Sequence, residues 1–231
     1  MKRFYKLAEA RPVQGGYQVQ LDGRGVKTPL GAQQIVPTGP IAEALAAEWN
    51  AQPEKLDPAL FRFRDLADYA IDMVAPDTDG TIAKLLTFLD TDTLCYRADP
   101  DEPIFKRQIS VWDPVLAALE NRHSVKLERI SGIMHRPQPA ETVAAIRDYM
   151  GRYDAFTLSE LITKTSLAAS LTIGLGSIEP DADIEQLWSA ANLEEDWQVE
   201  QWGSDAEAEA VRQRRQSDFM NAHAFGQMLR S

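Results

Sequence analysis

The sequence predicts an α+β protein, in which a small amino-terminal β-rich α/β domain precedes a larger all-α carboxyl-terminal domain. Three observations lead to this fold class. Residues 16–21 alternate apolar and polar side chains and run into Asp22-Gly23, which is typical of a strand entering a hairpin. Near residue 38 the spacing of apolar residues changes from that of a strand to that of a helix. Beyond residue 80 the helical spacing dominates the chain.

The first forty residues are predicted to form mainly β-structure. Residues 16–21 read GYQVQL, and their alternation gives a strand with one buried face. Asp22-Gly23 readily adopts the positive φ angles of a tight hairpin turn. Residues 34–36 are predicted as another short strand, while Pro29 and Pro37 confine the neighbouring strands to edges or ends.

Two helices are predicted to follow this β-structure. Thr38 is placed to cap the first helix, Pro40 fits its first turn, and Gln52-Pro53 ends it. The positions at helical spacing within it are Ile41, Leu45, Glu48, Trp49 and Gln52. A second helix is expected over residues 63–74.

The segment PDTDG at residues 76–80 is the best linker candidate in the chain. We therefore expect an amino-terminal domain of residues 1–76, with β-structure and one or two helices, and a helical domain of residues 77–231. The helices expected in the second domain start at Asp79 or Thr81, span Phe105 to Glu120, run from Thr157 through Leu171, start at Asp181 and start at Ser204.

Several helix boundaries in this region have local signals. Asp113-Pro114 predicts an interruption, because Asp can cap a helix and Pro can begin one. Residues 157–160 and 204–207 both have capping-box spacing. Gly174 and Gly176 are expected to stop the helix that precedes them.

Composition limits the classes of function. The chain has 231 residues, 44% of them hydrophobic, and 35 acidic against 24 basic residues give a formal net charge of −11. An acidic surface repels phosphates and anionic lipid, which argues against nucleic acid and membranes as partners. The start of the chain, MKRFYKLAEARP, lacks the apolar core of a signal peptide, so we expect a cytoplasmic protein. A mature form trimmed of an organellar presequence would look the same.

No motif for metal, nucleotide or nucleophilic chemistry stands out. The three histidines do not pair with each other or with the single Cys95 at metal-ligand spacing, and HExxH is missing. Cys95 lies in an apolar run and is expected to be a buried, inert thiol. There is no phosphate-binding GxxxxGK[ST] and no GxSxG. A catalytic triad assembled from distant residues stays open.

Residues 193–203 read LEEDWQVEQWG and place two tryptophans among four carboxylates. If residues 184–202 form one helix, Glu195 shares a narrow stripe with Trp188 and Trp202. A buried, unpaired carboxylate is costly, so Glu195 should have a partner. That partner is either internal, such as an arginine, a backbone amide or a cap, or belongs to another protein that binds the stripe. A catalytic carboxylate pair is the third interpretation.

Arg24, at the predicted hairpin tip, also has two interpretations. An arginine there can bind a carboxylate or phosphate, since turns often carry function. The alternative is a solvated surface charge.

Several short motifs occur together in a specific order. They are Lys2 to Lys6, Leu21 to Arg24 followed by Val26 to Pro29, Pro37-Thr38, Ala47 to Gln52, Asp92 to Arg97, Gln108 with Trp112 to Pro114, and Glu194 to Gln198 with Trp202-Gly203. In this order they resemble the assembly chaperone family for the soluble catalytic head of the F-type ATP synthase, the one that acts on the α subunit. The resemblance runs over nearly the whole chain.

This resemblance implies a two-part fold and a non-enzymatic function without cofactor or metal. The family holds the free α subunit until it meets β, in the bacterial cytoplasm or, for organellar relatives, in the mitochondrial matrix. We expect a monomer. An enzyme with a scattered active site and a general protein-binding adaptor remain the alternatives. The residues expected to bind the partner are Arg24, Trp49, Glu194, Glu195, Asp196, Trp197, Gln198 and Trp202.

Overall fold

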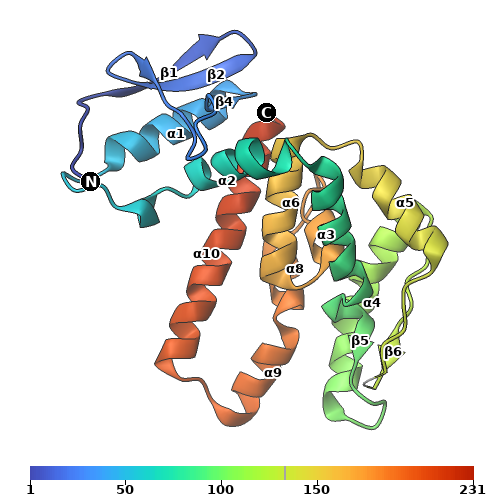
Figure 1. Cartoon of the computed structure of the whole chain (residues 1–231). Coiled ribbons are helices and arrows are strands. Elements are labelled where there is room, and N and C mark those ends of the chain that lie inside the picture. Colours follow the sequence, from blue (N-terminus) through green and yellow to red (C-terminus); the bar gives the residue numbers. More distant parts are fainter. Residues whose placement is uncertain (133) are drawn as a thin grey trace. The chain divides into compact units, whose positions relative to one another are not determined.

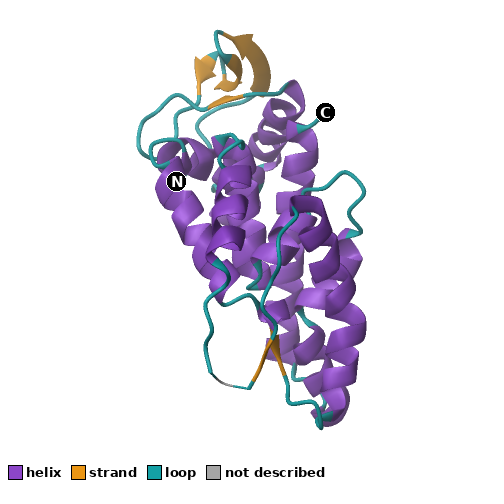
Figure 2. Ribbon diagram, turned by 90° about the vertical axis from the view of Figure 1, so that its right-hand side faces the viewer, coloured by secondary structure: helices purple, strands orange, loops and turns teal. Residues whose placement is uncertain are grey.

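The computed structural model describes residues 1–132 and 134–231 (Figure 1). The chain divides into two compact units: the first contains residues 1–78, 153–160 and 221–231, and the second contains residues 79–152 and 161–220. The predicted α+β fold class is confirmed. Apart from one short strand pair, the described strands lie in the first 36 residues, and helices make up most of the rest (Figure 2).

The first unit contains an antiparallel sheet of β1 (Ala8–Val13), β2 (Gly16–Leu21), β3 (Arg24–Gly25) and β4 (Ile35–Val36). Strand β2 pairs with the other three. Its last residue, Leu21, lies opposite Arg24, so Asp22 and Gly23 form a two-residue turn. Their φ angles of 48° and 80° confirm the predicted tight hairpin.

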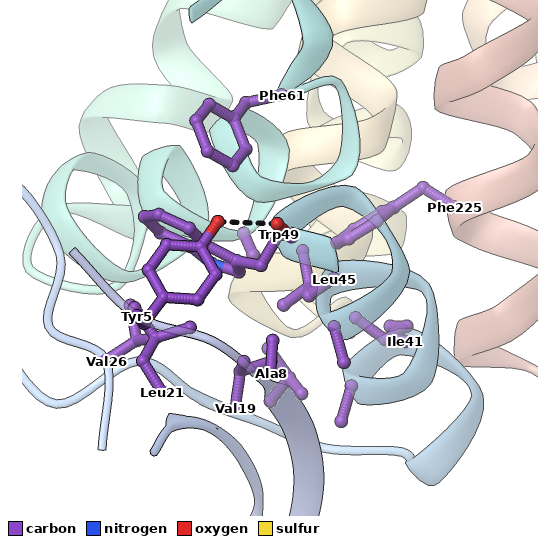
Figure 3. Packing of buried hydrophobic residues seen from close by; sticks show 14 residues of the cluster. Tyr5, Ala8, Val19, Leu21, Val26, Ile41, Leu45, Trp49, Phe61 and Phe225 are labelled. Carbon is purple, nitrogen blue, oxygen red and sulfur yellow. Dashed lines mark hydrogen bonds between the residues drawn. The ribbon is translucent and has the colours of Figure 1, made fainter. Parts of the chain in front are cut away.

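Helix α1 (Gly39–Ala51) contributes much of the core of the first unit. Its buried Ile41 and Leu45 pack in one cluster with Val19 and Leu21 of β2 (Figure 3). Burying a side chain of this size contributes about 1.5–3 kcal/mol. Phe225, near the carboxyl terminus, packs in the same cluster.

Thr38 precedes α1 as predicted, but it does not cap the helix. Its hydroxyl instead donates a hydrogen bond to the carbonyl of Met228, 2.7 Å away. Local sequence could not show this competing acceptor, because it lies 190 residues further along the chain.

The predicted helix over residues 63–74 is confirmed, as α2 (Phe63–Tyr69) followed by a π-helical turn, η2 (Ala70–Val74). A short 3₁₀ turn, η1 (Pro58–Leu60), precedes it. The carboxylate of Glu48 on α1 accepts hydrogen bonds from the backbone N–H groups of Arg62, Phe63 and Arg64 at 2.7–2.9 Å. Glu48 thus satisfies donors that the start of α2 would otherwise leave unpaired.

The second unit is built mainly from helices. They are α3 (Thr78–Asp90), η3 (Thr93–Cys95), α4 (Pro103–His123), α5 (Ala140–Met150), α6 (Ala155–Ala168), α7 (Leu171–Gly176), α8 (Ile184–Ala191), α9 (Leu193–Trp202) and α10 (Ala206–Leu229). The parallel pair β5 (Tyr96–Arg97) and β6 (Ile130–Ser131) adds the only other strands in the described chain. Helices α6 and α10 contribute residues to both units.

The first segment of the first unit ends at Thr78, inside the predicted linker, although residues 78–80 already belong to α3. It also includes residues 153–160 and 221–231, which lie far away in the sequence. The division of the chain into domains of residues 1–76 and 77–231 stays a prediction.

The predicted interruption at Asp113-Pro114 is wrong, because α4 runs through Pro114. Trp112 and Leu116 are fully buried at helical spacing on either side of this proline. Their burial keeps the helix intact although Pro114 cannot donate a backbone hydrogen bond. Asp113 does not cap a helix; its carboxylate pairs with Arg97 at 2.7 Å.

Gly174 and Gly176 lie inside α7 and do not stop the helix before it, which is a second correction. That helix, α6, ends at Ala168, and Ala169 follows with a φ of 49°. A Cβ atom on Gly174 would lie 2.1 Å from the Thr165 hydroxyl oxygen, so glycine permits close packing of α7 on α6.

Both predicted capping boxes are displaced by one or more residues. Asp154 accepts the hydrogen bond from Thr157 N at 2.7 Å, and Asp205 accepts from the backbone N–H groups of Glu207 and Ala208. Aspartate is an equally good cap, so spacing alone did not distinguish the two positions.

The single helix expected over residues 184–202 is also wrong. Asp183 caps α8, and the chain breaks at Asn192 before α9 begins. Asn192 is buried, and its side-chain amide donates to the Trp188 carbonyl at 2.8 Å. Trp188 and Trp202 therefore belong to different helices and do not share one stripe.

Candidate functional site

A surface hollow in the second unit, which we call the α9 hollow, contains several of the residues expected to bind a partner. Its volume is about 490 Å³. Strand β5 and the segment after it form one side, with Tyr96, Asp99 and Glu102. Helix α9 forms the other side with Glu194, Trp197, Gln198 and Trp202.

Gln108 of α4 fixes the position of Glu194. Gln108 is fully buried, and its side-chain Nε2 donates to Glu194 Oε1 at 2.7 Å while its Oε1 accepts from Ala98 N at 3.0 Å. The side chain thus links α9 to the segment after β5. Glu194 has an exposed surface, but partial burial of its carboxylate raises its pKa above the usual value.

The two tryptophans of α9 lie in different environments. The guanidinium of Arg107 lies 5.8 Å from the Trp197 ring centre, and Arg107 is held in turn by Glu200 at 2.6 Å. Trp202 is 79% exposed. An apolar side chain of this size in water is typical of a surface that binds another protein.

Glu195 and Asp196 point toward α10 of the same unit. Glu195 pairs with Arg215 at 3.4 Å, and Asp196 pairs with Arg212. Glu195 therefore has an internal arginine partner, one of the alternatives that the sequence left open. A role for these two acids in partner binding stays a prediction.

Arg24 and Trp49 lie in the first unit, at a second hollow of about 570 Å³ that we call the hairpin hollow. Trp49 is only 7% exposed and packs edge-to-face on Tyr5, whose hydroxyl donates to the Trp49 carbonyl (Figure 3). Trp49 is thus part of the core as well as the floor of the hollow. Arg24 is exposed at its rim.

Sequence reasoning did not select Gln108, Tyr96 or Asp99 as site residues. A signal existed for Gln108, since it shares a helical face with Trp112 and Leu116 and is the polar member of that face. The sequence contains no comparable pattern for Tyr96 and Asp99, because only the tertiary structure brings them opposite α9.

The described residues show no cluster that suits a metal ion, since no group of three or more His, Cys, Asp or Glu side chains among them has the required geometry. Cys95 is buried, and burial raises the pKa of its thiol. Within residues 1–132 and 134–231, no helix is sufficiently long and apolar to cross a membrane.

Comparisons with known proteins identify a family and several relatives of this chain. The family described as ATP12 chaperone protein matches residues 2–120. The chain is 26% identical over 222 residues to the mitochondrial protein atp12 of Schizosaccharomyces pombe, covering 91% of this chain and 76% of that protein.

Two solved structures have the same fold. The crystal structure of Atp12 from Paracoccus denitrificans superposes with a TM-score of 0.92 at 31% identity, covering 99% of this chain and 98% of that one. A crystal structure of an Agrobacterium tumefaciens protein gives a TM-score of 0.93 at 36% identity, covering 99% and 86%.

The family match and the shared fold define the class of this protein, which is that of the chaperones. Within this class, the chain belongs to the ATP12 chaperone family.

Proposed function

We propose that this protein binds the unassembled α subunit of ATP synthase, promotes assembly of the soluble ATPase head, and leaves when α pairs with β. Membership of the ATP12 chaperone family supports the proposal. The structural observation that carries it is Trp202, a tryptophan 79% exposed at the rim of the α9 hollow.

The mechanism is reversible protection of an apolar surface. An unassembled subunit exposes the interface that its neighbour will cover, and exposed apolar area promotes aggregation. A chaperone that binds this interface lowers the free concentration of the subunit. The β subunit displaces the chaperone because the α–β contact is the larger and stronger one.

The α9 hollow has a suitable composition for this function. Trp197 and Trp202 offer aromatic contact area, and Asp99, Glu102 and Glu194 surround it with carboxyl groups. Such a surface fits an apolar segment of the partner flanked by Lys or Arg side chains. Binding and release of this kind need no catalysis. We further propose that the protein acts as a monomer in the bacterial cytoplasm.

Purified protein is expected to suppress the aggregation of isolated α subunit, measured by light scattering, and added β should release the complex. Trp202→Ala is expected to weaken α binding by about tenfold, because truncation of an aromatic contact at an interface costs about 1.4 kcal/mol or more. Leu30→Ala is the control, since Leu30 is 73% exposed in the first unit and does not line either hollow.

Three results would contradict the proposal: no suppression of α aggregation, a complex that β cannot dissociate, or equal effects of Trp202→Ala and Leu30→Ala. Glu195→Gln separates two roles of that acid. Loss of folding would indicate that its pair with Arg215 is structural, and loss of binding by a folded variant would indicate partner contact. A pull-down that captures other complexes and no α subunit would favour the adaptor alternative.

A further inference from the structure

The hairpin hollow carries positive charge in an acidic protein. The whole chain has a net charge of −11, yet residues 1–30 contain six Lys and Arg residues and two acids. Two of these cations have acidic partners, because Lys2 pairs with Glu54 and Arg11 pairs with Glu9, and Arg3 donates hydrogen bonds to backbone carbonyls.

Arg24 and Lys27, which lie at the rim of the hollow, are different. Both are exposed, and neither side chain forms an ion pair or hydrogen bond with any part of the chain that the structure describes. Asp22, the one acid at the rim, is occupied by the backbone N–H groups of Lys6 and Leu7 at 3.0–3.2 Å. The rim therefore presents two unpaired cations.

The interior of the hollow is apolar and aromatic. Tyr5, Val26 and Trp49 form its floor, and Phe4 stands at its side with 65% of its surface exposed. Phe4 and Tyr5 pack edge-to-face, with ring centres 5.4 Å apart. An apolar floor beside two cations suits a segment that combines an apolar side chain with carboxylates.

The backbone around the hollow is fixed before a partner arrives. Arg24 lies opposite Leu21 across the two-residue turn, and Val26 N donates to Val19 O at 2.9 Å. A short hairpin loses little backbone entropy on binding, so the backbone positions that carry the two unpaired cations are set in advance.

We propose that the hairpin hollow docks an acidic segment of the partner chain, with carboxylates on Arg24 and Lys27 and an apolar side chain over Tyr5 and Trp49. This inference rests on the proposed function. It adds a second binding surface for the same partner and specifies the charge of the segment that binds there. The α9 hollow is lined with acids, whereas the hairpin hollow is rimmed with free bases. A partner that uses both must present segments of opposite charge, and this specifies its orientation.

The test compares two double variants with the same change in charge. Arg24→Glu/Lys27→Glu reverses the free cations, and Lys2→Glu/Arg11→Glu reverses cations that already have internal partners. Binding to isolated α subunit is measured by surface plasmon resonance at several salt concentrations. We expect the first double variant to bind about tenfold or more weakly and with less salt dependence, and the control to change less than about threefold. Circular dichroism verifies that both are folded.

Equal effects of the two double variants, or no effect of the first, would overturn the inference and leave the proposed function standing. If the unaltered protein does not bind α, the proposed function fails, and an acidic peptide becomes the probe. NMR signals of residues 23–27 should then shift with acetyl-Glu-Asp-Leu-Glu-Asp-amide and not with its Gln/Asn analogue. Unshifted signals would overturn the inference.

A second copy of this chain is the alternative occupant of the hairpin hollow. If the unaltered protein is a dimer and Arg24→Glu/Lys27→Glu converts it to a monomer, the inference is overturned.

Discussion

Asp68 of α2 is a buried acid whose proton affinity depends on folding. It is 7% exposed, and it accepts a hydrogen bond from Gln34 Nε2 at 2.5 Å, while Arg64 Nε lies 3.6 Å away. Burial outweighs both partners and raises the pKa of Asp68 to about 6. The folded chain therefore binds this proton more tightly than the unfolded chain does, and stability falls as pH rises from about 4 to about 6.

Asp68→Asn is expected to increase the free energy of unfolding at pH 8 by about 1–3 kcal/mol, because it removes a buried charge and keeps the side-chain size. The gain should disappear at pH 5, where the carboxyl of the unaltered protein is largely protonated. Urea denaturation at the two pH values measures it.

Asp65→Asn is the matched control, since Asp65 lies on the same helix with an exposed side chain. It should change stability by less than about 0.5 kcal/mol at either pH. Burial lowers the pKa of His123, which gives stability the opposite pH dependence near pH 6, so the difference between variant and unaltered protein is the quantity to compare. A gain of equal size at pH 5 and pH 8 would show that the charge of Asp68 is not its cause.

Some of the residues that carry the family resemblance stabilise the fold. Asp92 is fully buried and accepts hydrogen bonds from Leu94 N, Ser170 Oγ and Thr172 N at 2.7–3.0 Å. It thereby joins η3 to the start of α7. Arg3 donates to the Asn50 and Gln52 carbonyls at the end of α1. A motif can therefore identify a family without marking the surface that binds the partner.

At the scale of elements, α7 depends on a close approach to α6. Gly174→Ala is expected to destabilise the protein by about 1–3 kcal/mol, because the added Cβ would lie 2.1 Å from the hydroxyl oxygen of Thr165. Thr165 is fully buried and β-branched, so it cannot easily turn away. Chemical denaturation measures the loss.

Gly176→Ala in the same helix is the control, since its Cβ would meet Leu187 at an ordinary 3.7 Å. It should be neutral or stabilise by up to about 1 kcal/mol through helix propensity. Thr165→Ala added to Gly174→Ala should recover part of the loss. Equal stabilities of the two single alanine variants would exclude close packing as the reason for Gly174.

The break at Asn192 is the element boundary that most affects the candidate site. It separates Trp188 from the acids and tryptophans of α9, and the helical turn of α9 directs neighbouring acids to different sides. Glu194 reaches Gln108, whereas Glu195 and Asp196 reach Arg215 and Arg212. Three consecutive acids thus serve two different surfaces of the same unit.

At the scale of the whole molecule, the carboxyl-terminal end of the chain completes the amino-terminal unit. Phe225 of α10 is fully buried in the cluster that contains Ile41 and Leu45. Arg230 pairs at 2.8 Å with Glu160, which belongs to residues 153–160 of the same unit. The first unit therefore needs residues from the last turns of the chain.

Phe225→Ala is expected to destabilise the first unit by about 3–5 kcal/mol, because it removes a large buried side chain and leaves a cavity. Amide hydrogen exchange should accelerate in β2, at Val19 in particular, although Val19 lies more than 200 residues away in the sequence. Val211→Ala on the same helix, at a residue 42% exposed, should leave exchange in β2 unchanged. Unchanged exchange in Phe225→Ala would mean that the sheet and α1 are stable without α10.

The sequence by itself determined the hairpin at Asp22-Gly23, the helix from Gly39 to Ala51 and the family, because turn chemistry, apolar spacing and short motifs act over a few neighbouring residues. It also pointed to Glu194, Trp197 and Trp202, which line one hollow. Only the tertiary structure decided that the chain breaks at Asn192, that Gly174 lies within a helix, and that Phe225 joins the first unit. These features depend on which side chains are buried and which elements pack together in three dimensions, and local periodicity contains no information about that packing.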